Sequence, residues 1–405
     1  MKWLYFHQHF STPAGATGIR SYEFARALIA AGHEVTMVCG SYNVANTGLT
    51  APFINGMRRG DVDGIDVIEF ELTYANNHNF FQRSATFAKF ALRSIKVVFR
   101  EEYDAVFCTS TPLTAALPGL FAKWFRRKPF VFEVRDLWPE LPKAMGVITN
   151  PVILKGMDVL ETLAYRNADR LVGLSPGMVE GITRKLTKNT PVAMIPNGCD
   201  RELSDVEPVP ADQSCFDANT FNAVFAGAHG RANGLDAVLD TADVLQQRGD
   251  NRVAIYLIGA GREKQALQEQ AQKRALKNVH FVDPLPKKAL FAQLRHADVG
   301  LMTLQNIKEF YFGTSPNKFF DYLALGLPVV CNYPGWVSEL IKERDCGLPV
   351  TPEDANAFAD ALIDLSKRSS LHVQSQNCKD LAKDSFDRND LAQQFVEFID
   401  GAVAS

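Results

Sequence analysis

The chain has 405 residues, of which 46% are hydrophobic and 22% charged, and its formal net charge is −3. This composition excludes a disordered protein and a coiled coil, and the charge excludes a general attraction to nucleic acid. No apolar run reaches the roughly 18 residues that a transmembrane helix needs. The start, Met1 to His9, lacks the pattern of a secretory signal, and the seven scattered cysteines form no C-x-x-C pair. We therefore expect a cytoplasmic protein of two or three domains with reduced thiols and no zinc site.

Short apolar runs alternate with helical patterns along the whole chain. Segments such as 22–31 and 235–248 carry apolar residues every three or four positions, as a helix with one buried face does. The predicted strands are 2–7, 34–39, 65–70, 104–108, 130–134, 170–174 and 192–195, then 222–226, 252–258, 278–282, 298–303, 328–331 and 347–350. Continuous apolar strands separated by helices predict parallel sheets covered on both faces. Because these strands are too many for one sheet, and 201–219 has the composition of a linker, we expect two doubly wound α/β domains facing a cleft.

Three glycine-rich loops leave predicted strands and enter predicted helices. The first, 12–20, contains Gly15 and Gly18, and its alternative interpretation is an ordinary turn with packing glycines. The second, 225–235, contains Gly230 and Arg231, and the third, 257–264, contains Arg262. A planar guanidinium matches phosphate oxygens, although either arginine alone is better explained as a solvated charge of a loop. Two such loops on adjacent strands predict a phosphate-binding site.

The fourth loop, Gly313 to Val330, is the most specific of the four. Ser315 is predicted as an N-cap and Pro316 as the first helical residue, so that the helix start would face a phosphate. Lys318 and Asp321 are three residues apart and share a helix face. A cation beside a phosphate and a carboxylate that accepts two hydroxyl protons suit a nucleoside diphosphate. The alternative is an ordinary ion pair between these two side chains.

These motifs carry a resemblance that spans nearly the whole chain. They are Gly32-His33-Glu34-Val35-Thr36, Arg135-Asp136-Leu137-Trp138-Pro139-Glu140, Ile195-Pro196-Asn197-Gly198-Cys199-Asp200, 227–235, Gly259-Ala260-Gly261 and 316–330, in this order. The chain resembles the family-4 glycosyltransferases, which have the two-domain GT-B fold. The run from Asp136 to Glu140 is similar to the branch that builds bacterial surface polysaccharides (O-antigen and capsule), including the N-acetylfucosamine transferases. The resemblance implies an acceptor-binding Rossmann-like domain at 1–200, a nucleotide-sugar-binding one at 201–385, and a C-terminal helix in 386–405 that crosses back to the first.

The resemblance also implies the activity and a site. Sugar would move from a nucleotide diphosphate, usually a UDP-sugar, with retention at the anomeric carbon and with no cofactor. Arg231 and Lys318 would face the diphosphate, Asp321 would hold the ribose, Phe281 and Val282 would border the base, and the loop of Gly15 and Gly18 would close over the phosphates. From the loops themselves we add to this donor site Gly230, Arg262, Ser315 and Asn317. The catalytic residues would be Asp136, Arg231 and Lys318.

Two positions depart from the family pattern. The family often has two glutamates with seven residues between them in the fourth loop; Asp321 takes the second place and Gly313 the first, with Glu309 as a candidate substitute. Many members carry a histidine at the end of the strand before Asp136, where this chain has Arg135. Either Asp136 or Glu133 would then act on sugar or acceptor, and Arg135 is an alternative stabiliser of donor charge.

Metal ions are expected to play no part. Asp61-Val62-Asp63 matches the D-x-D pattern of metal-dependent transferases, but Asp63-Gly64 is a strong hairpin-turn signal. Retention without a covalent intermediate requires no carboxylate pair at glycosidase spacing. Arg231, Lys318 and a helix start would instead stabilise the departing diphosphate.

The acceptor is suggested by a basic region. Residues 83–128 carry nine basic and three acidic residues. Aromatic residues are interleaved with them; they include Phe80, Phe81, Phe87, Phe90, Trp124 and Phe125. Such helices suit an anionic bilayer, where a polyprenyl-diphosphate-linked glycan would be the acceptor, whereas the alternative is a set of core aromatics with solvated lysines. We expect peripheral binding to the inner face of the plasma membrane.

Two rival functions stay open. A GT-B nucleotide-sugar 2-epimerase would need acid and base groups at the sugar C2, and no carboxylate–histidine set is evident in the sequence. A catalytically silent nucleotide-sugar-binding subunit is suggested by Gly313 and Arg135, whereas the intact Arg231, Lys318 and Asp321 disfavour it.

Overall fold

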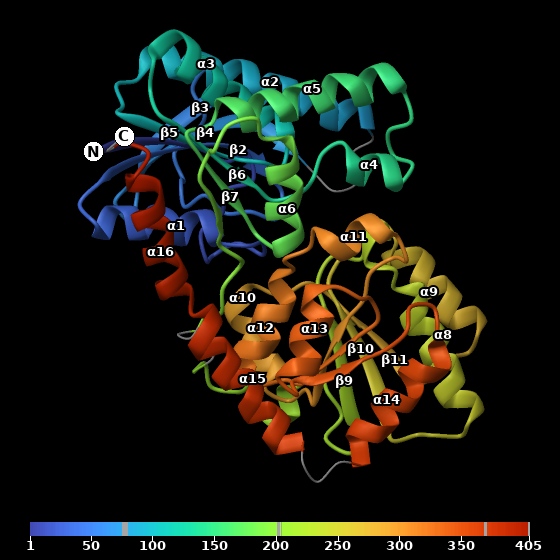
Figure 1. Ribbon diagram of the computed structural model, residues 1–405. Coiled ribbons are helices and arrows are strands. Elements are labelled where there is room, and N and C mark those ends of the chain that lie inside the picture. Colours follow the sequence, from blue (N-terminus) through green and yellow to red (C-terminus); the bar gives the residue numbers. More distant parts are fainter. Residues whose placement is uncertain (75–79, 201–202, 204, 368–370, 404–405) are drawn as a thin grey trace. The chain divides into compact units, whose positions relative to one another are not determined.

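The structure is a computed structural model that describes residues 1–74, 80–200, 203, 205–367 and 371–403. The chain divides into unit 1, Met1–Pro196 with Asn389–Ser405, and unit 2, Asn197–Arg388. Each unit is a sheet covered by helices, so the expected pair of doubly wound α/β domains is confirmed (Figure 1). In the described part of the chain, none of the helices combines the length and the apolar character needed to cross a bilayer.

Unit 1 is built on one mixed sheet of eight strands in the order β3-β4-β2-β1-β5-β6-β7-β8. The strands are β1 (Lys2–Phe6), β2 (Glu34–Tyr42), β3 (Met57–Val62), β4 (Ile65–Tyr74), β5 (Ala105–Thr109), β6 (Phe130–Val134), β7 (Arg170–Gly173) and β8 (Val192–Met194). The helices are α1 (Arg20–Ala30), α2 (Phe80–Arg100), η1 (Leu113–Ala115), α3 (Ala116–Arg126), α4 (Glu140–Ala144), α5 (Pro151–Asn167), α6 (Pro176–Lys185) and α16 (Arg388–Asp400). One core lies between the sheet and α2, α3 and α5, and another between the sheet and α1 with α16.

Unit 2 is built on a parallel sheet of six strands in the order β11-β10-β9-β12-β13-β14. The strands are β9 (Phe221–Ala226), β10 (Val253–Ile258), β11 (Val279–Val282), β12 (Val299–Met302), β13 (Val329–Cys331) and β14 (Gly347–Pro349). The helices are η2 (Ala211–Gln213), η3 (Arg231–Asn233), α8 (Asp236–Gln247), α9 (Lys264–Lys273), α10 (Lys287–Leu294), α11 (Lys308–Phe312), α12 (Asn317–Leu325), α13 (Trp336–Glu343), α14 (Ala355–Lys367) and α15 (Leu371–Phe386). The order reverses between β9 and β12, and ligands of such sheets bind outside the carboxyl ends of the strands at this point.

Strand β3 was not expected from the sequence. It pairs antiparallel with β4 at the edge of the unit 1 sheet, and most of its side chains are at least partly exposed. Its sequence, MRRGDV, is charged and contains a glycine, as edge strands that resist pairing with another chain often are. The apolar pattern that revealed the central strands is therefore absent from β3.

The segment 201–219 is not a free linker. The backbone N–H of Val209 donates to Ala292 O at 3.3 Å, and that of Asp217 donates to the Tyr256 hydroxyl at 2.9 Å. Residues 201, 202 and 204 lie outside the described residues. The described remainder belongs to unit 2 and is held to the rest of that unit by these backbone hydrogen bonds.

The C-terminal helix returns to unit 1, as expected. Phe395 of α16 stacks on Phe24 of α1 with ring centroids 4.1 Å apart and meets Phe107 of β5 edge-on at 5.0 Å. His33 Nε2 lies 3.2 Å from Asp400 Oδ2. The apolar face of α16 therefore completes a core that α1 alone does not cover.

Candidate active site

Two of the predicted glycine loops form one continuous surface at the carboxyl ends of β9 and β10. The N–H of His229 donates to Ala260 O, and the N–H of Glu263 donates to His229 O, both at 2.9 Å. A Cβ on Gly259, whose φ is 149°, would lie 1.9 Å from Gly227 O. Glycine is therefore required at Gly259 because the two loops touch backbone to backbone.

Lys318 places an unpaired cation beside this surface. From the first turn of α12 its Nζ donates to Asn233 Oδ1 at 2.9 Å and lies 4.1 Å from the centre of the Phe225 ring. Within the residues that the structure describes, Lys318 forms no ion pair. Burial lowers the pKa of its ammonium group to about 7. A desolvated ammonium group without a carboxylate, at the start of a helix, is suited to bind an anion.

His229 is a site residue that sequence reasoning missed. Its side chain is 0% exposed, and neither ring nitrogen has a hydrogen-bond partner among the described residues. Burial, together with the nearby Lys264 and Lys318, lowers the pKa of this imidazole to about 4, so the ring is neutral at pH 7. The only signal in the sequence was a polar residue inside a glycine loop.

Lys264 connects the same surface to the predicted base-binding edge. Its Nζ donates to Gly259 O at 2.9 Å, to Val282 O at 3.1 Å and to Asp283 Oδ1 at 2.8 Å. The Phe281 ring lies 6.4 Å from that of His229. Phe281 and Val282, predicted beside the base, thus border the two glycine loops.

Asp321 belongs to a charged cluster on the same helix. Its Oδ1 lies 3.2 Å from Lys287 Nζ, and Lys287 also pairs with Asp200, which Arg388 contacts in turn. Burial raises the pKa of the Asp321 carboxyl, and Lys287 opposes that rise. The ordinary Lys318–Asp321 ion pair that was the alternative for this helix does not form.

Arg231 and Arg262 are both exposed, and in the described ranges neither guanidinium has a hydrogen bond or ion pair. Arg231 opens η3, the turn that also holds Asn233, the partner of Lys318. Arg231 therefore lies in the same turn as the residue that binds Lys318, and Arg262 lies in the neighbouring glycine loop. Both arginines are available to a ligand.

The helix start differs from prediction by one residue. α12 begins at Asn317 with Pro316 in the N-cap position and no side-chain cap. Instead, the Ser315 hydroxyl accepts the backbone N–H of Asn197 at 3.2 Å. The N-cap assignment of Ser315 was therefore wrong, because a contact distant in sequence takes its oxygen. Gly313 ends α11, and Glu309 stands exposed in the first turn of that helix.

In unit 1, a second polar group lies at the carboxyl ends of β1, β5 and β6. Thr111, held at a φ of 89°, donates its hydroxyl to Asp136 Oδ2 at 2.8 Å, and burial raises the pKa of Asp136. Arg135 Nη1 lies 3.2 Å from Nε2 of His7. Arg135 stands where many family members have a histidine. In this chain the His7 imidazole, at the end of β1, lies next to Arg135 instead. The sequence analysis placed His7 at the end of the predicted strand 2–7 and did not name it as a site residue, whereas the structure ends β1 at Phe6.

Glu133 is committed to the core of unit 1. It is 0% exposed, accepts the Arg20 Nε–H at 2.9 Å and accepts the Thr109 hydroxyl at 2.6 Å. Arg20 also donates to the carbonyl of Ile195 at 2.7 Å. Of the two alternatives, Asp136 and Glu133, only Asp136 keeps an oxygen free of such core contacts.

The loop of Gly15 and Gly18 precedes α1. A Cβ on Gly15 would lie 2.2 Å from Ser11 Oγ and 2.7 Å from Asn46 N. The Gly18 carbonyl accepts the Thr17 hydroxyl at 3.4 Å. Internal packing by itself therefore explains the glycine at position 15.

Asp61 and Asp63 lie in the β3–β4 hairpin, the interpretation that the sequence favoured. Val62 and Ile65 face each other across the β3–β4 hairpin, and Asp63 and Gly64 have φ of 54° and 85°. Both carboxylates accept hydrogen bonds, Asp61 from the N–H of Gly64 within the turn and Asp63 from the hydroxyl of Tyr22 in α1. The hairpin interpretation of this D-x-D pattern is confirmed.

Two family profiles of known proteins match this chain, one in each half. The profile of the "Glycosyl transferase 4-like domain" family matches residues 15–198, and that of "Glycosyl transferases group 1" matches residues 220–368. The chain belongs to the glycosyltransferases of the GT-B fold. No curated protein matched the sequence.

Solved structures of this fold match over the full length. Sucrose-phosphate synthase from Thermosynechococcus elongatus aligns with a TM-score of 0.77 and 18% identity, over 100% of this chain and 99% of that one. HepE from Anabaena, solved with UDP-glucose, aligns with a TM-score of 0.69 and 18% identity, over 99% of this chain and 100% of that one. WaaG, a glycosyltransferase involved in lipopolysaccharide biosynthesis, aligns with a TM-score of 0.72 and 14% identity, over 98% of this chain and 100% of that one.

Gly230 offers a direct test of the predicted donor site. Its φ of −110° suits any residue, and a Cβ added to it would meet no atom within 4 Å. We expect Gly230→Ala to leave the free energy of unfolding unchanged and to weaken nucleotide-sugar affinity about tenfold, because the methyl group would occupy the ligand's space. Thermal unfolding and calorimetric titration measure the two effects.

The matched control is Gly156→Ala in α5, where an added Cβ also meets no atom within 4 Å. It should leave affinity unchanged and raise stability slightly, because alanine favours helix. Equal nucleotide affinity of the Gly230→Ala and wild-type proteins would contradict the placement of the donor.

Proposed function

We propose that the protein transfers a sugar from a UDP-sugar to a glycan acceptor with retention at the anomeric carbon. The observation that carries the proposal is Lys318, a partly buried ammonium group with no carboxylate partner in the described residues, facing the turn that Arg231 opens. In this proposal Lys318, Arg231 and Arg262 hold the diphosphate, with the backbone of Gly230, Ser315 and Asn317 beside it. HepE, a protein of the same fold, was solved with UDP-glucose, which supports the choice of nucleotide.

The proposed reaction needs the protein to orient both substrates and to stabilise charge, and it needs no nucleophile from the protein. The leaving phosphate oxygen takes the acceptor proton on the face of the sugar that it leaves. Lys318 and Arg231 stabilise the charge that grows on the diphosphate, and Asp321 orients the ribose. Asp136, whose carboxyl is held by Thr111, is proposed to contact the sugar or the acceptor from unit 1.

Metal independence follows from cations that the protein itself supplies. We expect turnover to persist in EDTA and not to rise when manganese is added. The reason is that Lys318 and Arg231 would stabilise the diphosphate charge that a metal ion stabilises in other transferases. Assays of sugar transfer with and without chelator measure this. Loss of turnover in EDTA with recovery on adding manganese would overturn the site assignment.

A surface on α2 and α3 supports a membrane-bound acceptor. Along α2, Lys89, Leu92, Lys96, Phe99 and Arg100 follow helical spacing and are all exposed. On α3, Trp124 and Phe125 are 44% and 63% exposed, next to the exposed Arg127. We call these residues of the two helices the α2/α3 face.

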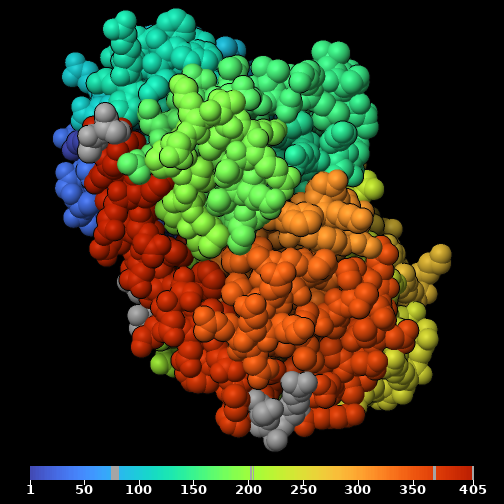
Figure 2. Space-filling model, in the orientation of Figure 1, coloured from blue at the N-terminus to red at the C-terminus, as the bar shows by residue number. Residues whose placement is uncertain are grey.

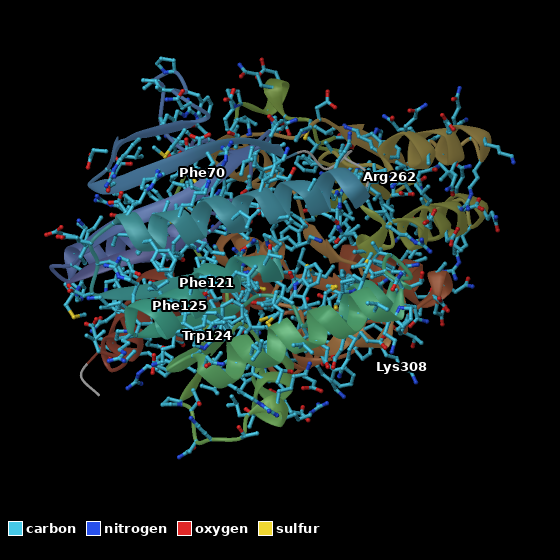
Figure 3. The ribbon with its side chains drawn as sticks, turned by 90° about the horizontal axis from the view of Figure 1, so that it is seen from above. Phe70, Phe121, Trp124, Phe125, Arg262 and Lys308 are labelled. Atoms are coloured by element: carbon cyan, nitrogen blue, oxygen red, sulfur yellow. The ribbon has the colours of Figure 1, made fainter. Side chains whose placement is uncertain are left out.

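The two parts of the α2/α3 face adjoin. The Phe99 and Phe125 rings lie 6.3 Å apart, and Phe121, Trp124 and Phe125 project together from α3 (Figure 3). In the space-filling view, α3 and the neighbouring α5, cyan to green, form an outer surface of unit 1 (Figure 2). Aromatic side chains bordered by lysine and arginine suit the headgroup region of an anionic bilayer.

Other members of the basic region are used internally. Phe90 and Val97 are core residues, Lys123 pairs with Asp169, and Arg93 donates to Gly56 O at 2.8 Å. The side chains of Phe80 and Phe81 lie outside the described residues. The core-aromatic alternative thus holds for part of the region, and the α2/α3 face remains for the membrane.

Charge reversal tests the α2/α3 face. Lys96→Glu with Arg100→Glu should reduce binding to vesicles containing phosphatidylglycerol by tenfold or more, since each basic residue contributes about 1 kcal/mol at such a surface. Flotation of the two proteins measures it. Lys273→Glu with Lys277→Glu, on unit 2, is the control and should float like the wild type. Wild-type protein that does not float with anionic vesicles would contradict the membrane proposal.

The proposed acceptor is a polyprenyl-diphosphate-linked glycan in bacterial surface polysaccharide synthesis. WaaG, involved in lipopolysaccharide biosynthesis, has the same fold and supports this choice. The decisive experiment screens nucleotide sugars by thermal shift and then follows donor turnover without acceptor. Slow hydrolysis of a stabilising UDP-sugar supports a transferase. An epimerised donor would identify an epimerase, and unchanged donor a silent binding subunit.

A further inference from the structure

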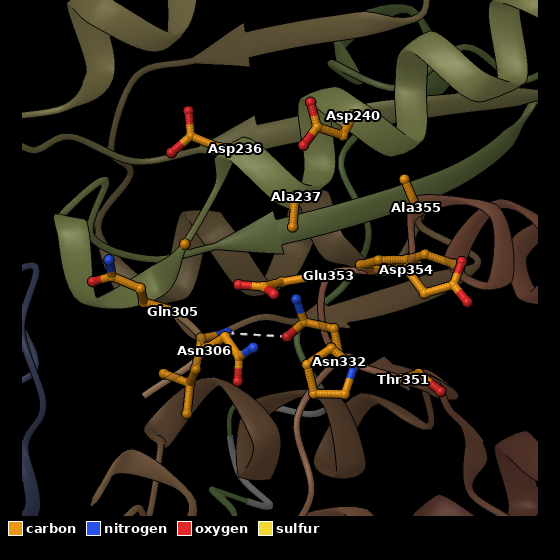
Figure 4. Close-up of a pocket in the computed structure, with 14 residues that line it drawn as sticks. Asp236, Ala237, Asp240, Gln305, Asn306, Asn332, Thr351, Glu353, Asp354 and Ala355 are labelled. Atoms are coloured by element: carbon orange, nitrogen blue, oxygen red, sulfur yellow. Dashed lines mark hydrogen bonds between the residues drawn. The ribbon is translucent and has the colours of Figure 1, made fainter. Parts of the chain in front are cut away.

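A pocket of about 230 Å³ opens at the carboxyl edge of the unit 2 sheet, beside α8 and α14 (Figure 4). Its lining residues lie within four segments, namely 234–240, 304–306 after β12, Asn332 after β13, and 351–358 after β14. None of the proposed donor-binding residues lines it. The space is large enough for a small polar molecule.

The lining is acidic and contains no basic residue. Its carboxylates are those of Asp236, Asp240, Glu353 and Asp354. Three already have partners, namely Gln270 for Asp236, Arg274 for Asp240, and the backbone N–H of Ala357 for Asp354. Glu353, held at a φ of 60°, has no hydrogen bond or ion pair to any residue in the described ranges. Glu353 is therefore the carboxylate that a positively charged ligand group would meet.

Asn332 supplies a hydrogen-bond donor to the same space. The side chain is 4% exposed, and its Oδ1 accepts the backbone N–H of Leu304 at 3.1 Å, which fixes the orientation of the amide. Its Nδ2 has no partner in the described part of the chain and points into the pocket in Figure 4. This N–H group of a nearly buried residue is thus free to donate to a ligand oxygen.

We propose that this pocket binds a small polyhydroxylated amine, such as an amino sugar. The ammonium group would face Glu353, and a hydroxyl oxygen would accept from Asn332 Nδ2. The apolar wall, which includes Phe358 and Pro352, would contact the carbon skeleton. An organic cation is favoured over a metal ion because no group of three or more His, Cys, Asp or Glu side chains is arranged to hold one among the described residues.

Calorimetric titration of the full chain with D-glucosamine and with D-glucose, without nucleotide, tests the proposal. Glucosamine should bind saturably and at least tenfold more tightly than glucose, because only the amine meets Glu353. Glu353→Gln should weaken glucosamine binding about tenfold, and Asn332→Ala should weaken both sugars. Glu343→Gln, an exposed glutamate of α13, is the matched control and should bind like the wild type.

Equal affinity for both sugars, no saturable glucosamine binding, or unchanged binding by Glu353→Gln would each overturn the proposal. Lys318→Met should bind glucosamine as the wild type does. A loss in that variant would mean that the sugar occupies the donor site, which overturns this pocket and leaves the proposed function untouched.

Discussion

Replacing Lys318 by methionine should lower the turnover number about 100- to 1,000-fold, a loss of about 3 kcal/mol of transition-state stabilisation. Methionine has a similar length but removes the ammonium group that lies 4.1 Å from the centre of the Phe225 ring, and with it the charge that would face the diphosphate. The fold should tolerate the change, because the ammonium group is desolvated and has no carboxylate partner in the described residues. Initial rates of sugar transfer and thermal unfolding measure the two effects.

Lys308→Met is the matched control, since Lys308 is an exposed lysine of α11 (Figure 3). It should keep wild-type turnover. A Lys318→Met enzyme that transfers sugar at the wild-type rate would contradict the donor placement.

The lowered pKa of Lys318 adds a pH dependence to the same prediction. The ammonium group is charged below a pKa of about 7 and loses its charge as pH rises through that value. Nucleotide-sugar affinity should therefore fall above about pH 7 in the wild type and be independent of pH there in Lys318→Met. A diesterified diphosphate does not titrate in this range, so the slope belongs to the protein.

The stability of unit 2 should change with pH in the opposite direction. Because the folded-state pKa lies below the ordinary value of 10.5, the unfolded chain binds more protons between about pH 7 and 10.5. The burial penalty is complete below that window and disappears toward its upper end. Lys318→Met should flatten the curve of unfolding free energy against pH.

Glu133→Gln should lower the unfolding free energy of unit 1 by about 3 kcal/mol, since it leaves the buried Arg20 guanidinium without its counter-charge. The side chains of Arg20 and Glu133 are 2% and 0% exposed and 2.9 Å apart. Donor affinity should be unchanged, because the cations proposed to hold the diphosphate belong to unit 2. Urea unfolding and nucleotide-sugar titration measure both quantities.

Glu102→Gln, an exposed glutamate of unit 1, is the control and should keep full stability. The double variant Arg20→Met with Glu133→Leu should recover part of the loss, because it removes both charges together. If Glu133→Gln abolished turnover without reducing stability, Glu133 would act on a substrate and the structural interpretation would be wrong.

The candidate site was predictable where the chemistry is local. Glycines after a strand, and a lysine and an aspartate three apart at a helix start, lie within one stretch of chain. The partners of those residues lie elsewhere in the sequence. Asn233 meets Lys318 across 85 positions, and Asn197 takes the Ser315 hydroxyl across 118. Contacts between residues so far apart in the sequence cannot be predicted from hydrophobic periodicity or motif spacing.

The sequence by itself determined the two α/β units, because buried parallel strands must be apolar on both faces and therefore stand out from the helices between them. Only the tertiary structure decided which ionisable groups are already neutralised. It pairs Glu133 with Arg20, joins Asp321 to Lys287 and leaves Lys318 without a carboxylate in the described residues. The physical reason is that the fate of a charge depends on its burial and on its neighbours within a few ångströms, and folding sets both.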